Sequence, residues 1–295
     1  MSPHHLALLL LVIGNLAASL SDVAVKLIEG GISPFQYIFL RQCFALLLIL
    51  PFYLKQKQDK RTLKQTPITL IRAHLILLGS GCMVVAITYL PLATANAVFY
   101  AAPLLMLPLS VWLLKEQPPL GKILLTGFGF IGVLIVLRPN QFHWAALFAL
   151  GTATTLALFN ILVRRLPSEQ TVVTTLWWTT LFSLPLSTLL AAFFWQPIAA
   201  RELALVFMSA GCILSYNGLA VLAYQKAPAG EIAFAEYSGL VFVTLFGIYW
   251  FNEIPDFLSV IGMTMILLPI MLKNAISTRW RLVKKKYDKA QNKAL

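Results

Sequence analysis

Four polar residues interrupt the first long apolar stretch of the chain at a spacing that brings them together. They follow one another at steps of four, three and four residues and are Asn15, Ser19, Asp22 and Lys26. In an α-helix this spacing places all four on one face. Charged side chains are costly in hydrocarbon, so this face must point away from lipid, and Asp22 becomes a candidate for proton exchange. Asp22 could also pair with Lys26 one turn away, a contact worth about 0.2–0.5 kcal/mol at a wet surface.

Arg41 is the candidate partner of Asp22 on the next apolar stretch. Each residue lies about six or seven positions inside its stretch, roughly 9–10 Å at the rise of a helix, so the two share a level. A guanidinium at this depth could bind the carboxylate or phosphate of a solute. The alternative is a static pair that fixes the two helices together, and the desolvation cost of such a pair argues against a role in stability.

Polar and aromatic residues recur in the second half of the chain. Asn160 and Arg164 repeat the end of the first polar face 138 residues later, with the same spacing of four. Glu236 lies about seven residues into a later apolar stretch, beside Tyr237, and could bind a cation, exchange a proton or serve as a hydrogen-bonded structural acid. Trp177 could stack on a solute or anchor its helix at the membrane interface.

These side chains fall into two tiers on either side of an apolar middle. The first tier is Asp22, Arg41, Asn96 and Tyr100, and the second is Asn160, Trp177, Asn217, Glu236 and Tyr237. The predicted substrate-binding residues are Arg41, Asn96, Tyr100, Trp177, Asn217, Glu236 and Tyr237. Among them, Arg41 and Glu236 would bind the opposite charges of a zwitterion. Asp22, Lys26 and Asn160 are predicted to act in coupling or gating, and proton coupling would use one of the buried carboxylates.

Motifs of enzymes and metal sites are absent from the sequence. There is no glycine-rich phosphate loop, no zinc-binding pair of histidines on a helix and no nucleophile elbow. The histidines are scattered, and the three cysteines lie inside apolar stretches without ligand spacing. The prediction is a protein that is not an enzyme and that uses no cofactor or metal.

The composition indicates which elements must position these residues. Hydrophobic residues make up 59% of the chain and charged residues 12%, and the mean hydropathy is +0.80. Apolar stretches of about 18–23 residues, long enough to cross a hydrocarbon core of roughly 30 Å, recur from end to end. The prediction is an all-α polytopic membrane protein with ten spans, at Leu6–Ile28, Pro34–Phe52, Ile71–Tyr89, Leu92–Leu114, Lys122–Leu137, Trp144–Val163, Thr171–Phe194, Leu203–Tyr224, Ala229–Trp250 and Phe257–Leu272.

The net charge of +12 is unevenly placed along the chain. With both termini on the cytoplasmic side, the inner segments hold nearly all the Lys and Arg, including Arg72, whereas the outer connections hold only Arg138 and Arg201. This asymmetry predicts an orientation with both termini inside. It also indicates that the basic residues meet anionic lipid, not nucleic acid, and a partner for the basic tail is the alternative.

One segment of the sequence is repeated. Residues 91–118 and 228–255 align without a gap, and the identical positions include Pro91 with Pro228, Tyr100 with Tyr237, Glu116 with Glu253 and Pro118 with Pro255. Self-similarity at a fixed offset indicates two copies of one structural unit. The predicted division is 1–140 and 141–275, with five spans each, and a basic cytoplasmic tail at 276–295.

Because five is an odd number, the second copy would cross the membrane upside down relative to the first. Inverted repeats are typical of secondary transporters, whose solute site lies near the midplane and which work by alternating access. A membrane-embedded enzyme or a channel is the minor alternative, since neither a polar cluster at one face nor a continuous polar lining is visible. Glu116 and Glu253 stand at span ends, where hydrogen bonding to a helix end is expected.

The chain resembles bacterial carriers of the drug/metabolite transporter superfamily, in the EamA-type branch with ten helices. The resemblance rests on SDVAVKL at Ser21–Leu27, FLRQCFALLL at Phe39–Leu48 and the Glu-x-Pro that follows the fourth and ninth spans. The stretch YSGLVFVTLFGIYWFNEIPD at Tyr237–Asp256 is similar to carriers of S-adenosylmethionine or riboflavin.

The resemblance implies a secondary active transporter of a small charged or zwitterionic metabolite, amino-acid-like or S-adenosylmethionine-like, in the bacterial inner membrane. A vitamin carrier of the riboflavin type or a drug carrier of the same fold is the alternative. The implied partners are the metabolite and the lipid bilayer, with no nucleic acid, in a monomer or homodimer.

Overall fold

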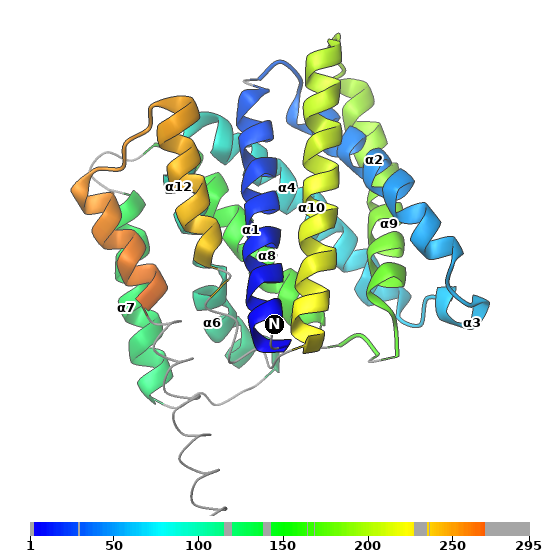
Figure 1. Cartoon of the computed structure of the whole chain (residues 1–295), viewed down its shortest axis with the longest axis horizontal. Helices are drawn as coiled ribbons and strands as arrows, with labels where there is room; N and C mark the ends of the chain where they lie inside the picture. The colour runs from blue at the N-terminus through cyan, green and yellow to red at the C-terminus, as the bar shows by residue number, and fades with distance from the viewer. Residues whose placement is uncertain are drawn as a thin grey trace, which may run out of the picture.

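The computed structural model describes residues 3–28, 30–114, 120–137, 143–163, 165–167, 169–226, 235 and 237–268, and these form α-helices joined by short connections, with no β-strand among them. The helices are α1 (Pro3–Leu27), α2 (Pro34–Leu54), α3 (Gln58–Arg61), α4 (Thr66–Tyr89), α5 (Leu92–Phe99), α6 (Ala102–Leu114), α7 (Leu120–Leu137), α8 (Ala145–Val163), α9 (Val172–Phe193), α10 (Ala200–Lys226) and α12 (Ser238–Phe251), followed by an apolar helix at Phe257–Leu268 (Figure 1). The all-α prediction is confirmed.

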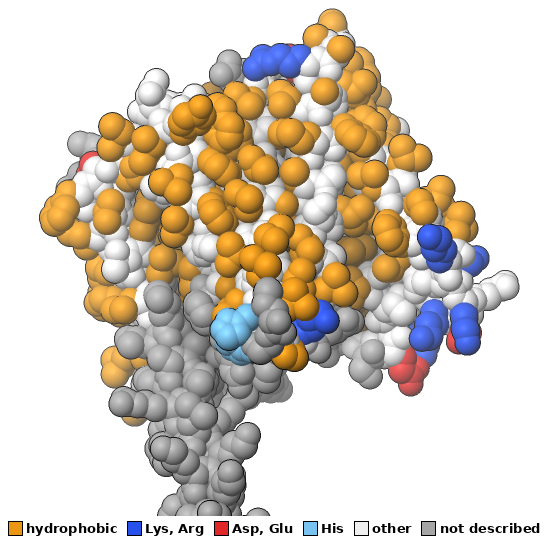
Figure 2. Space-filling view, in the orientation of Figure 1, with side chains coloured by type: hydrophobic (Ala, Val, Ile, Leu, Met, Phe, Trp, Pro, Cys, Tyr) orange, Lys and Arg blue, Asp and Glu red, His pale blue; other side chains and the backbone are white. Residues whose placement is uncertain are grey.

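The lengths and surfaces of the helices are those of a multi-pass membrane protein. Among the described residues, seven helical segments are long and apolar enough to cross a membrane, one of them running through α5 and α6, and shorter apolar helices lie at Ile123–Leu137, Ser238–Phe251 and Phe257–Leu268. Figure 2 shows hydrophobic side chains over most of one face, while Lys and Arg gather near α3. Large apolar side chains such as Trp112 are exposed because they meet hydrocarbon instead of water. The count of ten spans stays a prediction.

Polar side chains fix where two of the long helices begin. Ser33 precedes Pro34, and its hydroxyl accepts a hydrogen bond from the backbone N–H of Gln36 at 3.1 Å, so Ser33 caps α2. Thr171 caps α9 in the same way, accepting from the N–H of Thr174 at 3.2 Å. Both caps supply partners for N–H groups that have none inside their own helix.

The predicted span Leu92–Leu114 is one apolar stretch but forms two helices, α5 and α6. Pro103 explains the break, because it has no N–H to donate to the carbonyl of Phe99 four residues earlier. Tyr100 in the connection has φ −67° and ψ −8°, and Tyr237 before α12 has φ −74° and ψ −10°. The two tyrosines thus share a backbone conformation where α6 and α12 begin.

Helices that are distant in sequence pack side by side in a recurring arrangement (Figure 1). Helix α1 lies along α10, and α8 lies along α4; α2 contacts α10, and α9 contacts α4. Helices α2 and α9 contact each other, as do α5 and α12. Each of these contacts has a counterpart in the other half of the chain or is its own counterpart, which is the pattern expected of inverted repeats.

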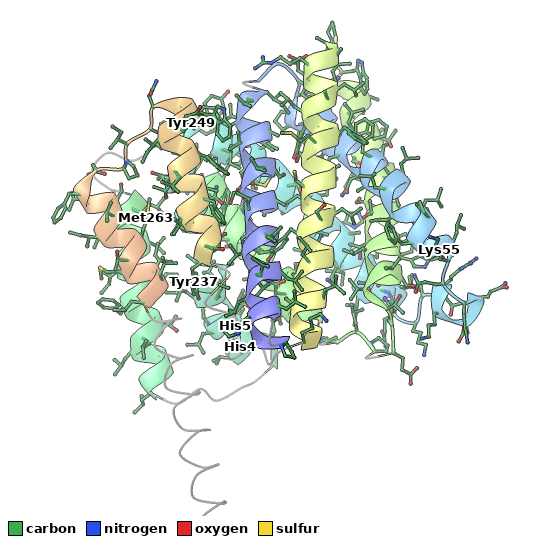
Figure 3. All side chains as sticks on the ribbon, in the orientation of Figure 1. His4, His5, Lys55, Tyr237, Tyr249 and Met263 are labelled. Atoms are coloured by element: carbon green, nitrogen blue, oxygen red, sulfur yellow. The ribbon has the colours of Figure 1, made fainter. Side chains whose placement is uncertain are left out.

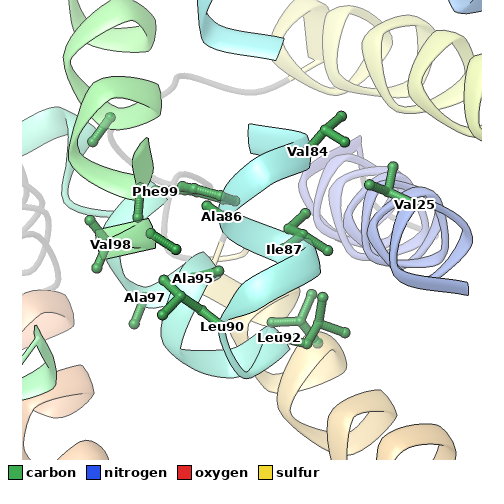
Figure 4. Close-up of a cluster of buried hydrophobic side chains, with 14 of the residues drawn as sticks. Val25, Val84, Ala86, Ile87, Leu90, Leu92, Ala95, Ala97, Val98 and Phe99 are labelled. Carbon is green, nitrogen blue, oxygen red and sulfur yellow. The ribbon is translucent and has the colours of Figure 1, made fainter. Parts of the chain in front are cut away.

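The main hydrophobic core lies where α1, α4, α5 and α8 meet and is rich in small residues. Figure 4 shows the part of it contributed by Val25, Val84, Ala86, Ile87, Leu90, Leu92, Ala95, Ala97, Val98 and Phe99. On α8, fully buried alanines recur every four residues, at 145, 149, 153 and 157. Where α8 packs against α4, glycines allow the close approach: a Cβ added at Gly79 would lie 2.5 Å from Thr155 Oγ1, and one added at Gly151 would lie 3.0 Å from Cys82 Sγ.

Gly239, at the start of α12, packs against Tyr100. A Cβ added at Gly239 would lie 1.9 Å from Tyr100 Oη and 3.1 Å from Asn15 Oδ1.

Gly239→Ala should therefore lower the unfolding temperature of the purified protein in detergent, at an overpacking cost of about 1–3 kcal/mol. Adding Tyr100→Phe should recover part of the loss, because the nearest atom is removed. Gly218→Ala, where a Cβ meets nothing within 4 Å, is the control. An unchanged unfolding temperature in Gly239→Ala would contradict the close contact.

Candidate functional site

The polar face of α1 points into the protein. Asn15 and Ser19 are each only 2% exposed. Asn15 Nδ2 donates to Leu11 O at 2.9 Å and to Ala235 O at 3.5 Å. Ser19 Oγ donates to Asn15 O at 2.8 Å and to Gly239 O at 3.2 Å. This face therefore holds the backbone that leads into α12.

Asp22 lies on the same face and meets residues of two other helices. Its carboxylate has a side-chain hydrogen bond with Asn96 of α5 and lies in the electrostatic field of Arg41 of α2. No direct ion pair joins Asp22 to Arg41 in the described part of the chain. The structure thus brings Asp22, Arg41 and Asn96 together, and the static ion pair considered from the sequence is not formed.

Hydroxyl groups surround the guanidinium of Arg41. Its Nη2 donates to Ser80 Oγ of α4 at 2.5 Å, and its Cζ lies 5.6 Å from the centre of the Tyr37 ring. Tyr37 Oη is hydrogen-bonded to Ser209 Oγ of α10 at 2.8 Å, and Ser209 Oγ to Ser21 Oγ of α1 at 2.7 Å. This hydroxyl network links α1, α2, α4 and α10 around one half-buried cation.

Lys26 pairs with Glu253 and not with Asp22. Its Nζ forms an ion pair with the Glu253 carboxylate and donates to Leu90 O at 2.8 Å. Glu253 Oε2 also accepts a hydrogen bond from the backbone N–H of Leu92 at 2.6 Å. Leu92 is the first residue of α5, whose first N–H groups have no partner inside the helix. Glu253 therefore accepts a hydrogen bond from the start of α5. The contact between Asp22 and Lys26 considered from the sequence does not form, because Lys26 pairs instead with Glu253, which follows the end of α12.

The second predicted tier is not gathered in the same way. Trp177 stacks on Tyr53 with ring centres 4.6 Å apart at an angle of 12°, so one face of its ring is occupied by protein. The other described members are Asn217, half-buried on α10, and Asn160, exposed on α8. Tyr237, which Figure 3 labels, is buried before α12. Glu236, Arg164 and Glu116 lie outside the residues that the structure describes.

Two cavities lie at the end of the bundle opposite to α3. The larger, about 450 Å³, is lined by Thr94, His143 and Glu253 among others, at the start of α5 and the end of α7. The smaller, about 190 Å³, lies between α1, α2 and α4, and Tyr37 forms part of its wall. Because the Tyr37 ring contacts Arg41, the smaller cavity borders the hydroxyl network.

The sequence pattern does not single out four residues of this region, which are Tyr37, Arg72, Ser80 and Ser209. Tyr37 lies one turn before Arg41, and that spacing could have placed both on one helix face. The serines carry no such signal, since serine in an apolar helix often bonds its own backbone. Arg72 is counted with the inner positive charges, at the edge of the predicted span Ile71–Tyr89, but α4 begins five residues earlier, at Thr66, and buries Arg72.

Comparisons with known proteins point to one family. The model of the EamA-like transporter family matches residues 5–138 and again residues 143–274. The S-adenosylmethionine uptake transporter of Rickettsia prowazekii is 25% identical over 254 residues, which cover 85% of this chain and 86% of that protein. The riboflavin transporter of Vibrio cholerae serotype O1 is 27% identical over 291 residues, 96% of each chain. A solved crystal structure, 19% identical, covers 92% of this chain and 98% of its own with a TM-score of 0.61, which shows a shared fold.

Glu253→Ala removes the partner of Lys26 and the acceptor for the N–H of Leu92. Hydrogen bonds to a charged group are worth about 1.5–3 kcal/mol, so the unfolding temperature of the purified protein should fall. Glu253→Gln, which keeps an oxygen for Leu92, should lose less. Glu169→Gln, in the exposed ion pair with Lys64, is the matched control and should change little. Equal losses at the two glutamates would contradict the role of Glu253.

Proposed function

The chain belongs to the EamA-like transporter family, and we propose that it carries a small zwitterionic metabolite, of the S-adenosylmethionine or amino-acid type, by secondary active transport. The name of the Rickettsia prowazekii relative, an S-adenosylmethionine uptake transporter, supports this class of solute. The observation that carries the proposal is the proximity of Arg41 and Asp22, two half-buried opposite charges in one region, beside a cavity whose wall includes Tyr37.

The two charges are complementary to those of a zwitterion. The guanidinium of Arg41 has five N–H donors, and its described partners, Ser80 and Tyr37, are hydroxyl side chains, so it can still take a carboxylate. Asp22, together with Asn96, can bind the positive group of the solute. Two unit charges 4 Å apart attract by about 4 kcal/mol at an effective dielectric constant of 20, which favours such pairing where water is scarce. Glu236 stays a predicted second contact for positive charge.

We further propose ten spans in two inverted halves, residues 1–140 and 141–275, with both termini and the basic tail 276–295 in the cytoplasm of a bacterial cell. The counterpart packing of α1 with α10 and of α8 with α4 supports this division. The end of the bundle that carries the basic helix α3 would then face the cytoplasm. The two cavities would face the outside. Alternating access would follow when the two halves exchange conformations.

A flat solute of the riboflavin type is the second candidate, because the Vibrio cholerae relative is a riboflavin transporter. Such a solute gains most from stacking on aromatic rings. Trp177, the predicted stacking residue, is already stacked on Tyr53. The zwitterion is therefore the better-supported solute.

Removing either charge should abolish most of the uptake. In proteoliposomes with labelled S-adenosylmethionine, Arg41→Gln and Asp22→Asn should each lower uptake on the order of tenfold or more, as expected for loss of one charge-assisted contact. Arg41→Lys should keep part of the activity, because the charge remains while the donor geometry is lost. Arg201→Gln, an exposed arginine at the opposite end from α3, is the control. Parental uptake in both charge variants would remove the proposed site.

Both termini should be reached from the same side of the membrane. Cysteine tags placed before Pro3 and after Leu295 should react with a membrane-impermeant thiol reagent only in inside-out vesicles. A tag in the connection at Gln196 should react only in right-side-out vesicles, because seven predicted spans, an odd number, separate it from the amino terminus. Termini labelled from different sides would contradict the two-repeat architecture.

A further inference from the structure

Arg72 of α4 and Ser209 of α10 stand at equivalent positions in the two repeats of the chain. Arg72 lies towards the end of the bundle nearer α3, and Ser209 lies towards the opposite end. The offset of 137 residues that aligns the repeated segments takes Arg72 to Ser209 (72 + 137 = 209). The offset of 138 that aligns the polar ends of α1 and α8 takes Ser21 to Phe159 (21 + 138 = 159). Ser21 contacts Ser209 at 2.7 Å, and the guanidinium of Arg72 lies 3.9 Å from the centre of the Phe159 ring. The two contacts are counterparts.

The side chain of Arg72 is buried with unused donors. It is 3% exposed, and neither Nε nor Nη1 has a hydrogen-bond partner among the described residues. Buried polar groups are nearly always paired, and an unpaired buried charge costs several kcal/mol. A cation–π contact with Phe159 returns about 2 kcal/mol. The arrangement therefore holds a desolvated cation whose hydrogen bonds are left for another molecule.

We infer that Arg72 is a second binding residue for the carboxylate of the transported zwitterion, reached when the half nearer α3 opens. The inference rests on the proposed function. Arg72 lies roughly 9 Å inside α4 from its start at Thr66, near the α3 end, whereas Arg41 lies near the opposite end, beside the smaller cavity. During transport the carboxylate of the solute would leave Arg41 and bind Arg72 on the other side of the apolar middle of the bundle. An unpaired charge is costly in that middle region, so a second cation is needed beyond it.

The first test compares binding with transport of labelled S-adenosylmethionine. Arg72→Met in detergent should bind within about threefold of the parent, because Arg41 and Asp22 are unchanged, while exchange across proteoliposomes should fall on the order of tenfold or more. Arg72→Lys should recover part of the exchange. Arg165→Gln, an exposed arginine near the same end, should exchange at the parental rate.

The melting temperature separates binding from a structural role. Methionine replaces an unpaired buried charge by an apolar side chain of similar length, so Arg72→Met should melt at or above the parental temperature. If Arg72 mainly held α4 to α8 through Phe159, Arg72→Met would instead melt lower and lose binding and exchange together. That result, or parental exchange in Arg72→Met, would overturn the inference.

A second test does not depend on the solute. Failure of the parent to bind S-adenosylmethionine would count against the proposed function, and thiol labelling would still decide the role of Arg72. In a protein carrying Cys43→Ser, Cys82→Ser and Cys212→Ser, Arg72→Cys should react with an anionic methanethiosulfonate reagent added on the side of α3. The reaction should be on the order of tenfold faster than in Ala73→Cys, whose position is fully buried on the same helix. Absence of reaction from either side would overturn the inference.

Discussion

The carboxylate of Glu253 joins three segments that lie far apart in the sequence, and the geometry of the site depends on it. A helix that starts inside a membrane protein has N–H groups that no water satisfies. The first N–H of α5 donates to Glu253, and Lys26 of α1 neutralises the same carboxylate. The start of α5 is thereby fixed against α1, and Asn96, about one turn further along α5, meets Asp22.

The surroundings of Arg41 suit a cation that must change partners. A hydroxyl can act as donor or acceptor without moving its oxygen, so Ser80 and Tyr37 can hold the guanidinium in the absence of a carboxylate and release it when one binds. A permanent carboxylate partner would compete with the solute. Hydrogen bonds from Tyr37 to Ser209 and on to Ser21 keep the ring in place during such an exchange.

The sequence is sufficient to predict features that follow from spacing along one helix. The inward face of α1 is of this kind, because steps of three and four residues decide which side chains share a face. Contacts between helices are not predictable in the same way: the partner of Lys26 is 227 residues away, and the hydroxyls of Ser80 and Ser209 have many possible partners in apolar sequence. Arg72 is counted with the positive charges at the inner edge of the membrane because hydropathy starts the span at Ile71, whereas α4 begins at Thr66 and Arg72 lies inside it. The break between α5 and α6 is hidden by an apolar stretch that stays continuous through Pro103.

The contact between Tyr100 and Gly239 makes the two halves of the chain unequal. The offset of 137 takes Ala102 to Gly239, so the first half carries a methyl group where the second half carries only hydrogen. A strictly symmetrical molecule would have two end states of the same free energy, with each conformer equally populated when no solute is bound. Under the proposed alternating access, the two conformers of this polypeptide with unequal halves would differ in energy, and the carrier would have a preferred resting state before any gradient acts on it.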